Sequence, residues 1–89
     1  QVKLFNLDCN IYPNPVSNKA IISYELANAS VAKVNVIDEL GKKVKQTSLH
    51  NGIQGVNTIQ LDLTILKSGT YFVILTAEGK QSTLQVIKK

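Results

Sequence analysis

The chain has 89 residues, 44% of them hydrophobic, and a net charge of +4. This length predicts one domain with its own packed core, and no apolar run approaches the ~20 residues of a membrane-spanning helix. All ten basic residues are lysines and tryptophan is absent, so the chain lacks the arginine forks and much of the aromatic stacking surface that nucleic-acid readers use. We therefore expect no nucleic-acid partner and no direct insertion into a membrane.

Short segments of alternating polarity, separated by turn residues, predict β-strands along the whole chain. In chain order they are residues 7–12, 20–26, 31–38, 44–49, 56–63, 70–77 and 82–89. The polar segment 44–49 is typical of an edge strand, and the very apolar segment 70–77 of a central one.

The alternation places one face of each longer strand in the core. The inward residues are Ile22, Tyr24, Leu26, Ala32, Val34, Val36, Ile59, Leu61, Leu63, Leu84 and Val86. Turn chemistry predicts a hairpin at residues 38–43 with Gly41 at positive φ, a loop at 50–55, a connection ending at Ser68–Gly69 and a tight turn at 77–80.

Seven short strands and no helical periodicity predict an all-β fold, a seven-stranded antiparallel immunoglobulin-like β-sandwich. A small barrel is the alternative. The Pro13-Asn14-Pro15 stretch follows the first strand. Because proline lacks an N–H and restrains the residue before it, this stretch predicts a stiff link from the first strand to the second, starting at Ala20.

The residues that carry chemistry do not form a catalytic or metal-binding constellation. His50 is the only histidine and falls in a predicted loop, and the six acidic residues are spread over different elements. Cys9 is the only cysteine, which excludes an internal disulfide and predicts a small buried hydrophobic residue in the first strand. We therefore expect no catalytic residue, no metal ion, no cofactor and no enzymatic activity.

Two further motifs have an ordinary structural interpretation. Asn28-Ala29-Ser30 fits a glycosylation pattern but is more typical of a polar turn. Tyr24 and Tyr71 are in phase with inward aliphatic residues, so we expect them in the core and not on a sugar-binding surface. Phe72 has the opposite phase, and its exposure would favour a docking surface.

Three stretches occur in a characteristic order: Tyr-Pro-Asn-Pro at 12–15, Leu-Lys-Ser-Gly-Thr-Tyr-Phe-Val at 66–73 and Leu-Gln-Val-Ile-Lys-Lys at 84–89. Between them lies Val-Asn-Val-Ile-Asp-Glu-Leu-Gly-Lys-Lys-Val at 34–44. As an ordered set covering nearly the whole chain, they resemble the type A C-terminal sorting domain of the type IX secretion system (Por secretion system) of Bacteroidetes-group bacteria.

This resemblance implies a secretion signal without enzymatic activity, and an immunoglobulin-like fold. Residues 1–89 would then be one sorting domain excised from a longer cargo protein, which the absence of methionine also suggests. The implied partners are the covalently linked upstream cargo, the type IX translocation machinery and a sortase-like surface peptidase that removes the domain. The cargo would pass through the periplasm and be released or attached to surface lipopolysaccharide. The alternatives are a carbohydrate-binding or adhesive accessory module and a structural spacer.

The resemblance also implies the sorting-motif residues. They are Pro13, Asn14, Pro15, Leu66, Gly69, Tyr71, Val86, Ile87, Lys88 and Lys89. We expect Gly69 and Tyr71 to serve folding, and Lys88 and Lys89, on a frayed terminus that needs no charge for packing, to be recognised directly. A docking mode in which the last strand or its lysine end adds to a sheet of the machinery is the corresponding hypothesis.

Overall fold

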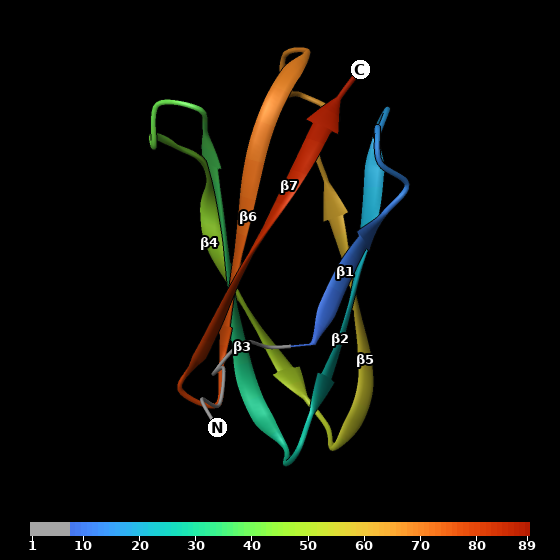
Figure 1. Ribbon diagram of the computed structural model, residues 1–89, viewed down its shortest axis with the longest axis vertical. Coiled ribbons are helices and arrows are strands. Elements are labelled where there is room, and N and C mark those ends of the chain that lie inside the picture. The colour runs from blue at the N-terminus through green and yellow to red at the C-terminus, as the bar shows by residue number, and fades with distance from the viewer. Residues whose placement is uncertain (1–7) are drawn as a thin grey trace, which may run out of the picture.

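The computed structural model describes residues 8–89 and contains seven strands over that range (Figure 1). They are β1 (Cys9–Tyr12), β2 (Lys19–Leu26), β3 (Ser30–Asp38), β4 (Lys43–Gly52), β5 (Gly55–Asp62), β6 (Gly69–Ala77) and β7 (Lys80–Lys88). All seven predicted strands are confirmed. Leu7, with which the first strand was expected to begin, lies outside the described residues.

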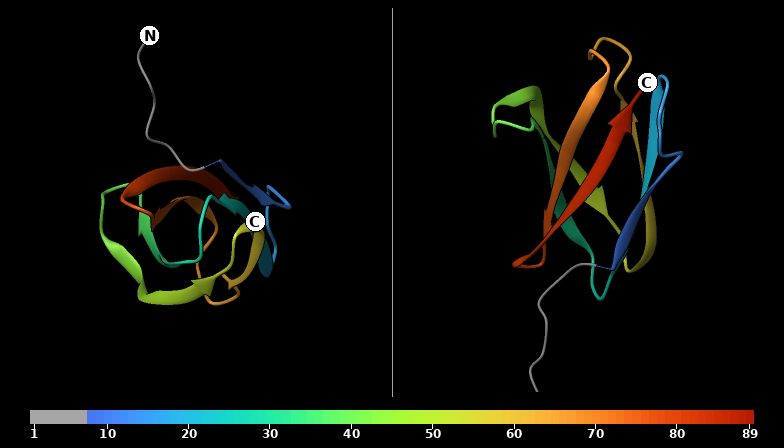
Figure 2. Two further views of the ribbon diagram at one scale, coloured as in Figure 1. Left: turned by 90° about the horizontal axis from the view of Figure 1, so that it is seen from below. Right: turned by 45° about the horizontal axis from the view of Figure 1, so that its top comes forward.

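The strands form two sheets, one in the order β1-β2-β5 and the other in the order β4-β3-β6-β7. Every strand pair is antiparallel, and Figure 2 shows the two layers in further views. The predicted immunoglobulin-like sandwich is therefore confirmed, with β4 on the edge and β6 in the interior of its sheet. β4 pairs with β3 and not with β5. In constant-type immunoglobulin domains the fourth strand belongs to the sheet of the first, second and fifth strands. Here it belongs to the other sheet.

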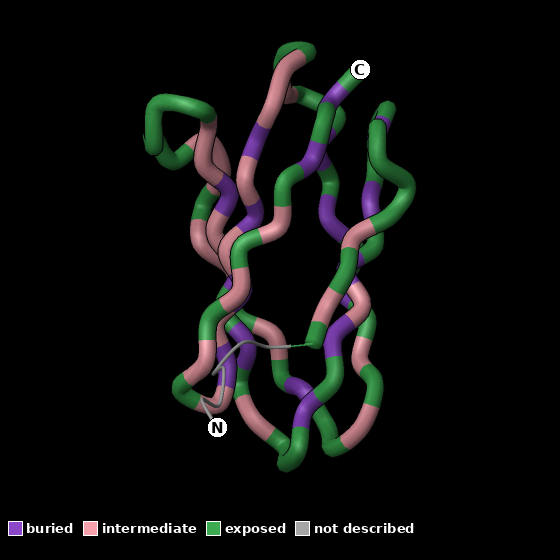
Figure 3. Tube along the Cα trace, viewed as in Figure 1, coloured by how far each residue is buried: buried purple, intermediate pink, exposed green. Residues whose placement is uncertain are grey.

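The core lies between the two sheets and is formed by alternate residues of the strands (Figure 3). Ten of the eleven predicted inward residues are buried and Leu84 packs against them. Val16 is also fully buried, at 0% exposure. The strand pattern did not predict it, because Val16 stands alone between two turns.

One predicted loop is wrong in part. β4 continues through His50 and Asn51 to Gly52, so only Ile53 and Gln54 connect it to β5. Pairing with β3 extends to the Ser30–Gly52 register, and this ladder overrides the turn propensity of Asn and Gly. His50 therefore lies in a strand, where its Nε2 is 2.9 Å from the Ser48 hydroxyl.

The turns at both ends of the sandwich are fixed by acidic side chains. In the predicted 38–43 hairpin, one Asp38 carboxylate oxygen accepts hydrogen bonds from the N–H groups of Leu40 and Lys42, each 2.9 Å long, and Gly41 has the expected positive φ of 84°. At the other end, the Glu78 carboxylate accepts hydrogen bonds from the N–H groups of Ala27 (3.3 Å) and Asn28 (2.8 Å). The predicted polar turn is confirmed at Asn28 and Ala29, whereas Ser30 already belongs to β3.

Candidate functional site

The Pro13-Asn14-Pro15 stretch carries the chain from one sheet to the other. β1 pairs with β2 as far as Tyr12, and both following prolines have cis peptide bonds. Val16 then forms a parallel bridge with Lys88 of the opposite sheet. The predicted link from the first strand to the second is present, but the chain docks on β7 before β2 begins, which the sequence did not predict. Residues without an N–H suit the point where a chain leaves one ladder and joins another.

Asn14 and Val16 together close the outer edge of β7 near its end. The Asn14 side chain donates to the Gln85 carbonyl at 3.0 Å and accepts from the Ile87 N–H at 2.9 Å. The Val16 N–H donates to the Ile87 carbonyl at 2.8 Å, and the Lys89 N–H donates to the Val16 carbonyl at 2.9 Å. We call Asn14 and Val16 the clip. The clip satisfies four successive outward-facing N–H and C=O groups of the last strand segment, which an edge strand otherwise exposes.

The two terminal lysines differ in their surroundings. Lys88 faces inward with Val86, is only 8% exposed, and donates from Nζ to the Lys89 carbonyl at 3.2 Å. Ile87 is 44% exposed and Lys89 is exposed. The expected frayed terminus is wrong, because the clip and the neighbouring strand β6 hold it. The inward-facing alternation of Leu84 and Val86, continued by two residues along the strand, would have predicted that Lys88 also faces the core.

The Leu66–Tyr71 segment forms the corner between β5 and β6. The Tyr71 hydroxyl donates to the Lys67 carbonyl at 2.7 Å, and Leu66 packs against the core. Gly69 has a φ of 154°. A tyrosine at the start of the sixth strand that bonds back to the preceding corner is the tyrosine corner of immunoglobulin-like folds. Tyr71 is 8% exposed, which agrees with its predicted core position.

The strand directions bring all ten predicted motif residues to one end of the sandwich, where the C-terminus lies (Figure 1). The Gly69–Lys88 and Tyr71–Val86 pairs join the corner to β7, and the clip joins the P-N-P stretch to the same strand. This end also carries a shallow pocket of about 280 Å³ between residues 38–40 of the hairpin and residues 67–71 of the corner. Sequence reasoning found these stretches separately but did not predict that they meet.

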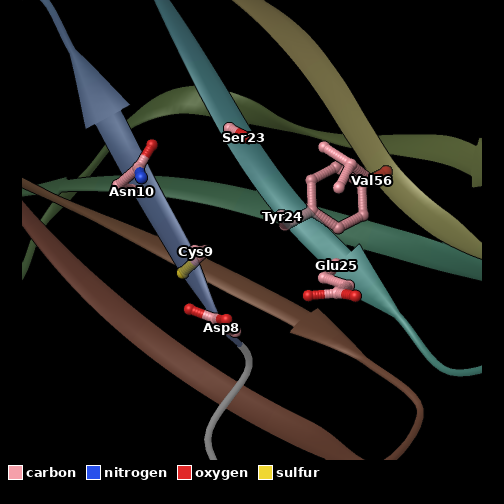
Figure 4. A pocket seen from close by; sticks show the side chains of 7 residues that line it. All are labelled: Asp8, Cys9, Asn10, Ser23, Tyr24, Glu25 and Val56. Carbon is pink, nitrogen blue, oxygen red and sulfur yellow. The ribbon is translucent and has the colours of Figure 1, made fainter.

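A smaller pocket of about 140 Å³ lies at the start of β1, between β1 and β2 (Figure 4). Cys9 lines this pocket and packs against the core from β1, but it is half-buried and not fully buried as predicted, because it borders the pocket. Burial raises the pKa of its thiol above the ordinary value, although a hydrogen bond with Ser82 acts in the opposite direction. A raised pKa leaves little of the reactive thiolate at neutral pH.

Residues 8–89 contain no group of three His, Cys, Asp or Glu side chains placed to hold a metal ion. Nor do they contain a helix long and apolar enough to cross a membrane.

Tyr24 is 2% exposed, which confirms its core position, whereas Tyr12 is 47% exposed. Phe72 is half-buried on the outer face of its sheet, between Ile37 and Gln85 in register.

The fold and the site define an immunoglobulin-like module in which Asn14 and Val16 hold the end of the last strand by hydrogen bonds. The chain matches the protein family described as the secretion system C-terminal sorting domain over residues 10–89, and it belongs to that family. The resemblance to type IX secretion sorting domains is thereby confirmed. Searches among curated proteins and among solved structures gave no significant match.

Membership has direct functional consequences. A type IX sorting domain is a C-terminal secretion signal, which implies interaction with the type IX secretion machinery and export to the cell surface or the medium. The family is not known as a catalytic one.

Proposed function

We propose that residues 1–89 form the sorting module of a longer cargo protein, covalently attached upstream, and that the end formed by the P-N-P stretch, the tyrosine corner and the end of β7 is its recognition site. The cargo passes through the periplasm, the machinery carries it across the outer membrane, and a sortase-like peptidase then removes the module. The cargo is released or attached to surface lipopolysaccharide. The direction of β1 supports this arrangement, because β1 begins at the opposite end of the sandwich.

The clip is the observation that carries the proposal. Because Asn14 and Val16 already bond to Gln85, Ile87 and Lys89, an added strand cannot pair with this edge of β7 unless the clip opens. Recognition at this end of β7 in the intact domain therefore uses side chains and not strand addition. The exposed Ile87 and Lys89 side chains carry it, and Lys88 acts mainly by packing, since it is 8% exposed.

An export assay in a bacterium with a type IX system tests this proposal. Residues 1–89 are fused behind a reporter with a periplasmic signal peptide, and the reporter is measured in the medium, at the surface and in the periplasm. We expect export with the native sequence, and a clear loss of export for Lys89→Gln with an unchanged melting temperature. Lys80→Gln, on the same strand at the opposite end, is the matched control and keeps full export.

Two results would reject parts of the proposal. Periplasmic retention of a folded native fusion would reject the sorting function and favour an accessory binding module. Full export of Lys89→Gln would leave sorting in place but remove Lys89 from the recognition site. Lys88→Gln, by contrast, should lower the melting temperature, because it shortens a buried aliphatic stem.

A further inference from the structure

The end of the sandwich that carries the motif residues also exposes two aliphatic side chains. Leu40 is 93% exposed at the β3–β4 hairpin, and Ile65 is 87% exposed on the β5–β6 connection. Leu40 and the corner residue Lys67 line the same pocket, which places the two loops side by side. Single exposed aliphatics are ordinary on a surface, but these two have the highest exposure among the described large hydrophobic residues.

Both side chains are presented by rigid loops. Leu40 follows Asp38, whose carboxylate accepts hydrogen bonds from the Leu40 and Lys42 N–H groups. Ile65 follows Asp62, whose carboxylate accepts hydrogen bonds from the Thr64 N–H at 3.0 Å and the Thr64 hydroxyl at 2.6 Å. The Leu66 N–H closes the second turn on the Leu63 carbonyl at 3.1 Å. A contact residue on a fixed loop loses little entropy on binding.

The same end holds most of the positive charge of the domain. Its charged side chains are seven lysines (Lys19, Lys42, Lys43, Lys45, Lys67, Lys88 and Lys89) against three carboxylates (Asp38, Glu39 and Asp62), a net charge of +4. The opposite end carries Asp8, Glu25 and Glu78 against Lys33 and Lys80, a net charge of −1. A charge asymmetry of this kind orients a domain toward a negatively charged partner.

We propose that Leu40 and Ile65 are apolar anchors of this basic end, and that they insert into an acidic protein surface of the secretion machinery. This inference rests on the proposed sorting function. Lys42, Lys67 and Lys89 meet carboxylates of that surface, and the aliphatic side chains fill apolar depressions within it. A lipid surface fits less well, because Glu39 lies beside Leu40 at the hairpin tip and neither loop carries the tryptophan or tyrosine of interfacial anchors.

The test combines export with position-specific crosslinking in secreting cells. Leu40→Ser with Ile65→Ser is compared with Leu49→Ser plus Val56→Ser, two aliphatics that are each 67% exposed away from the basic end. We expect export to fall roughly tenfold or more for the first pair and to stay at the native level for the second. Melting temperatures of both should match the native value, because none of the four side chains is buried.

A photo-crosslinking residue at position 40 should give an adduct with a machinery protein, and one at position 49 should not. Native export together with undiminished export of the Leu40→Ser, Ile65→Ser variant would overturn the inference but keep the sorting function. Retention of the native fusion would instead reject the sorting function. Co-sedimentation of the native domain with phosphatidylethanolamine–phosphatidylglycerol vesicles, lost in that variant, would replace the protein partner by a membrane and equally overturn the inference.

Discussion

The Asn14 side chain accepts a 2.9 Å hydrogen bond from the backbone N–H of Ile87, 73 positions further along the chain. The same amide donates to the Gln85 carbonyl at 3.0 Å. One side chain thus replaces the backbone partner that β7 would have in a longer ladder. This relationship explains why the asparagine between the two prolines matters to the C-terminal end.

The clip gives the first prediction. Asn14→Ala removes both hydrogen bonds and should cost about 1 kcal/mol, since each bond is solvent-accessible. For a domain of this size that lowers the melting temperature by roughly 4–8 °C. Asn14→Asp keeps the acceptor for the Ile87 N–H but loses the donor for the Gln85 carbonyl. Its melting temperature should therefore lie between those of the native domain and Asn14→Ala. Thermal unfolding with Asn18→Ala as a control in the same link measures the effect, and equal stability of both alanine variants would contradict it.

The tyrosine corner gives the second prediction. Tyr71→Phe keeps the ring in the core but removes the 2.7 Å hydrogen bond to the Lys67 carbonyl. The expected loss is about 1 kcal/mol of unfolding free energy, measured by urea denaturation. Tyr12→Phe, at a ring that is 47% exposed, should leave the midpoint unchanged. A Tyr71→Phe midpoint equal to the native one would show that the corner does not depend on the hydroxyl.

Gly52 gives the third prediction. A Cβ atom at this position would lie 2.5 Å from Leu26 Cδ1 and 3.1 Å from the Ser30 carbonyl oxygen. Gly52→Ala should therefore destabilise the domain by about 1–3 kcal/mol through overpacking. Leu26→Val withdraws the closest atom, so the double variant should lose less than the sum of the two single variants. Strict additivity in denaturant unfolding would mean that Leu26 does not limit the space.

Asp62 gives the fourth prediction. Hydrogen bonds from the Thr64 hydroxyl and from the Thr64 N–H hold the pKa of its carboxyl below the ordinary value. A carboxyl with a lowered folded-state pKa favours folding above its unfolded pKa, near 4, and this contribution is lost as the pH falls through the folded pKa. NMR titration should show the pKa rising toward the ordinary value in Thr64→Ala. An unchanged Asp62 titration curve would contradict the assigned cause.

The clip also separates folding from recognition among the motif residues. Asn14, Gly69, Tyr71 and Lys88 take part in contacts that hold the end of the sandwich together, whereas Lys89 is exposed. Substitution of the first group should reduce export in proportion to lost stability. Substitution of Lys89 should reduce export without that loss.

The strands and their inward faces were predictable from the sequence, because alternation of polar and apolar residues is a local property and the two-residue period fixes which face is buried. This holds for Ile22, Tyr24 and Leu26 on β2 and for the hairpin at Gly41. The family was predictable too, because the order of its short motifs along the chain is itself sequence information.

The tertiary structure alone decided which distant segments meet. Nothing local in Val16 indicates that it pairs with Lys88, and nothing local in His50 or Gly52 indicates that β3 extends the strand through them. Hydrogen bonds across 70 or more positions depend on the packing of whole sheets, because the partner groups come together only when both layers are assembled. The sequence thus determined the strands, their buried faces and the family, whereas the assembled sandwich determined the shared end, the clip and the burial of Lys88.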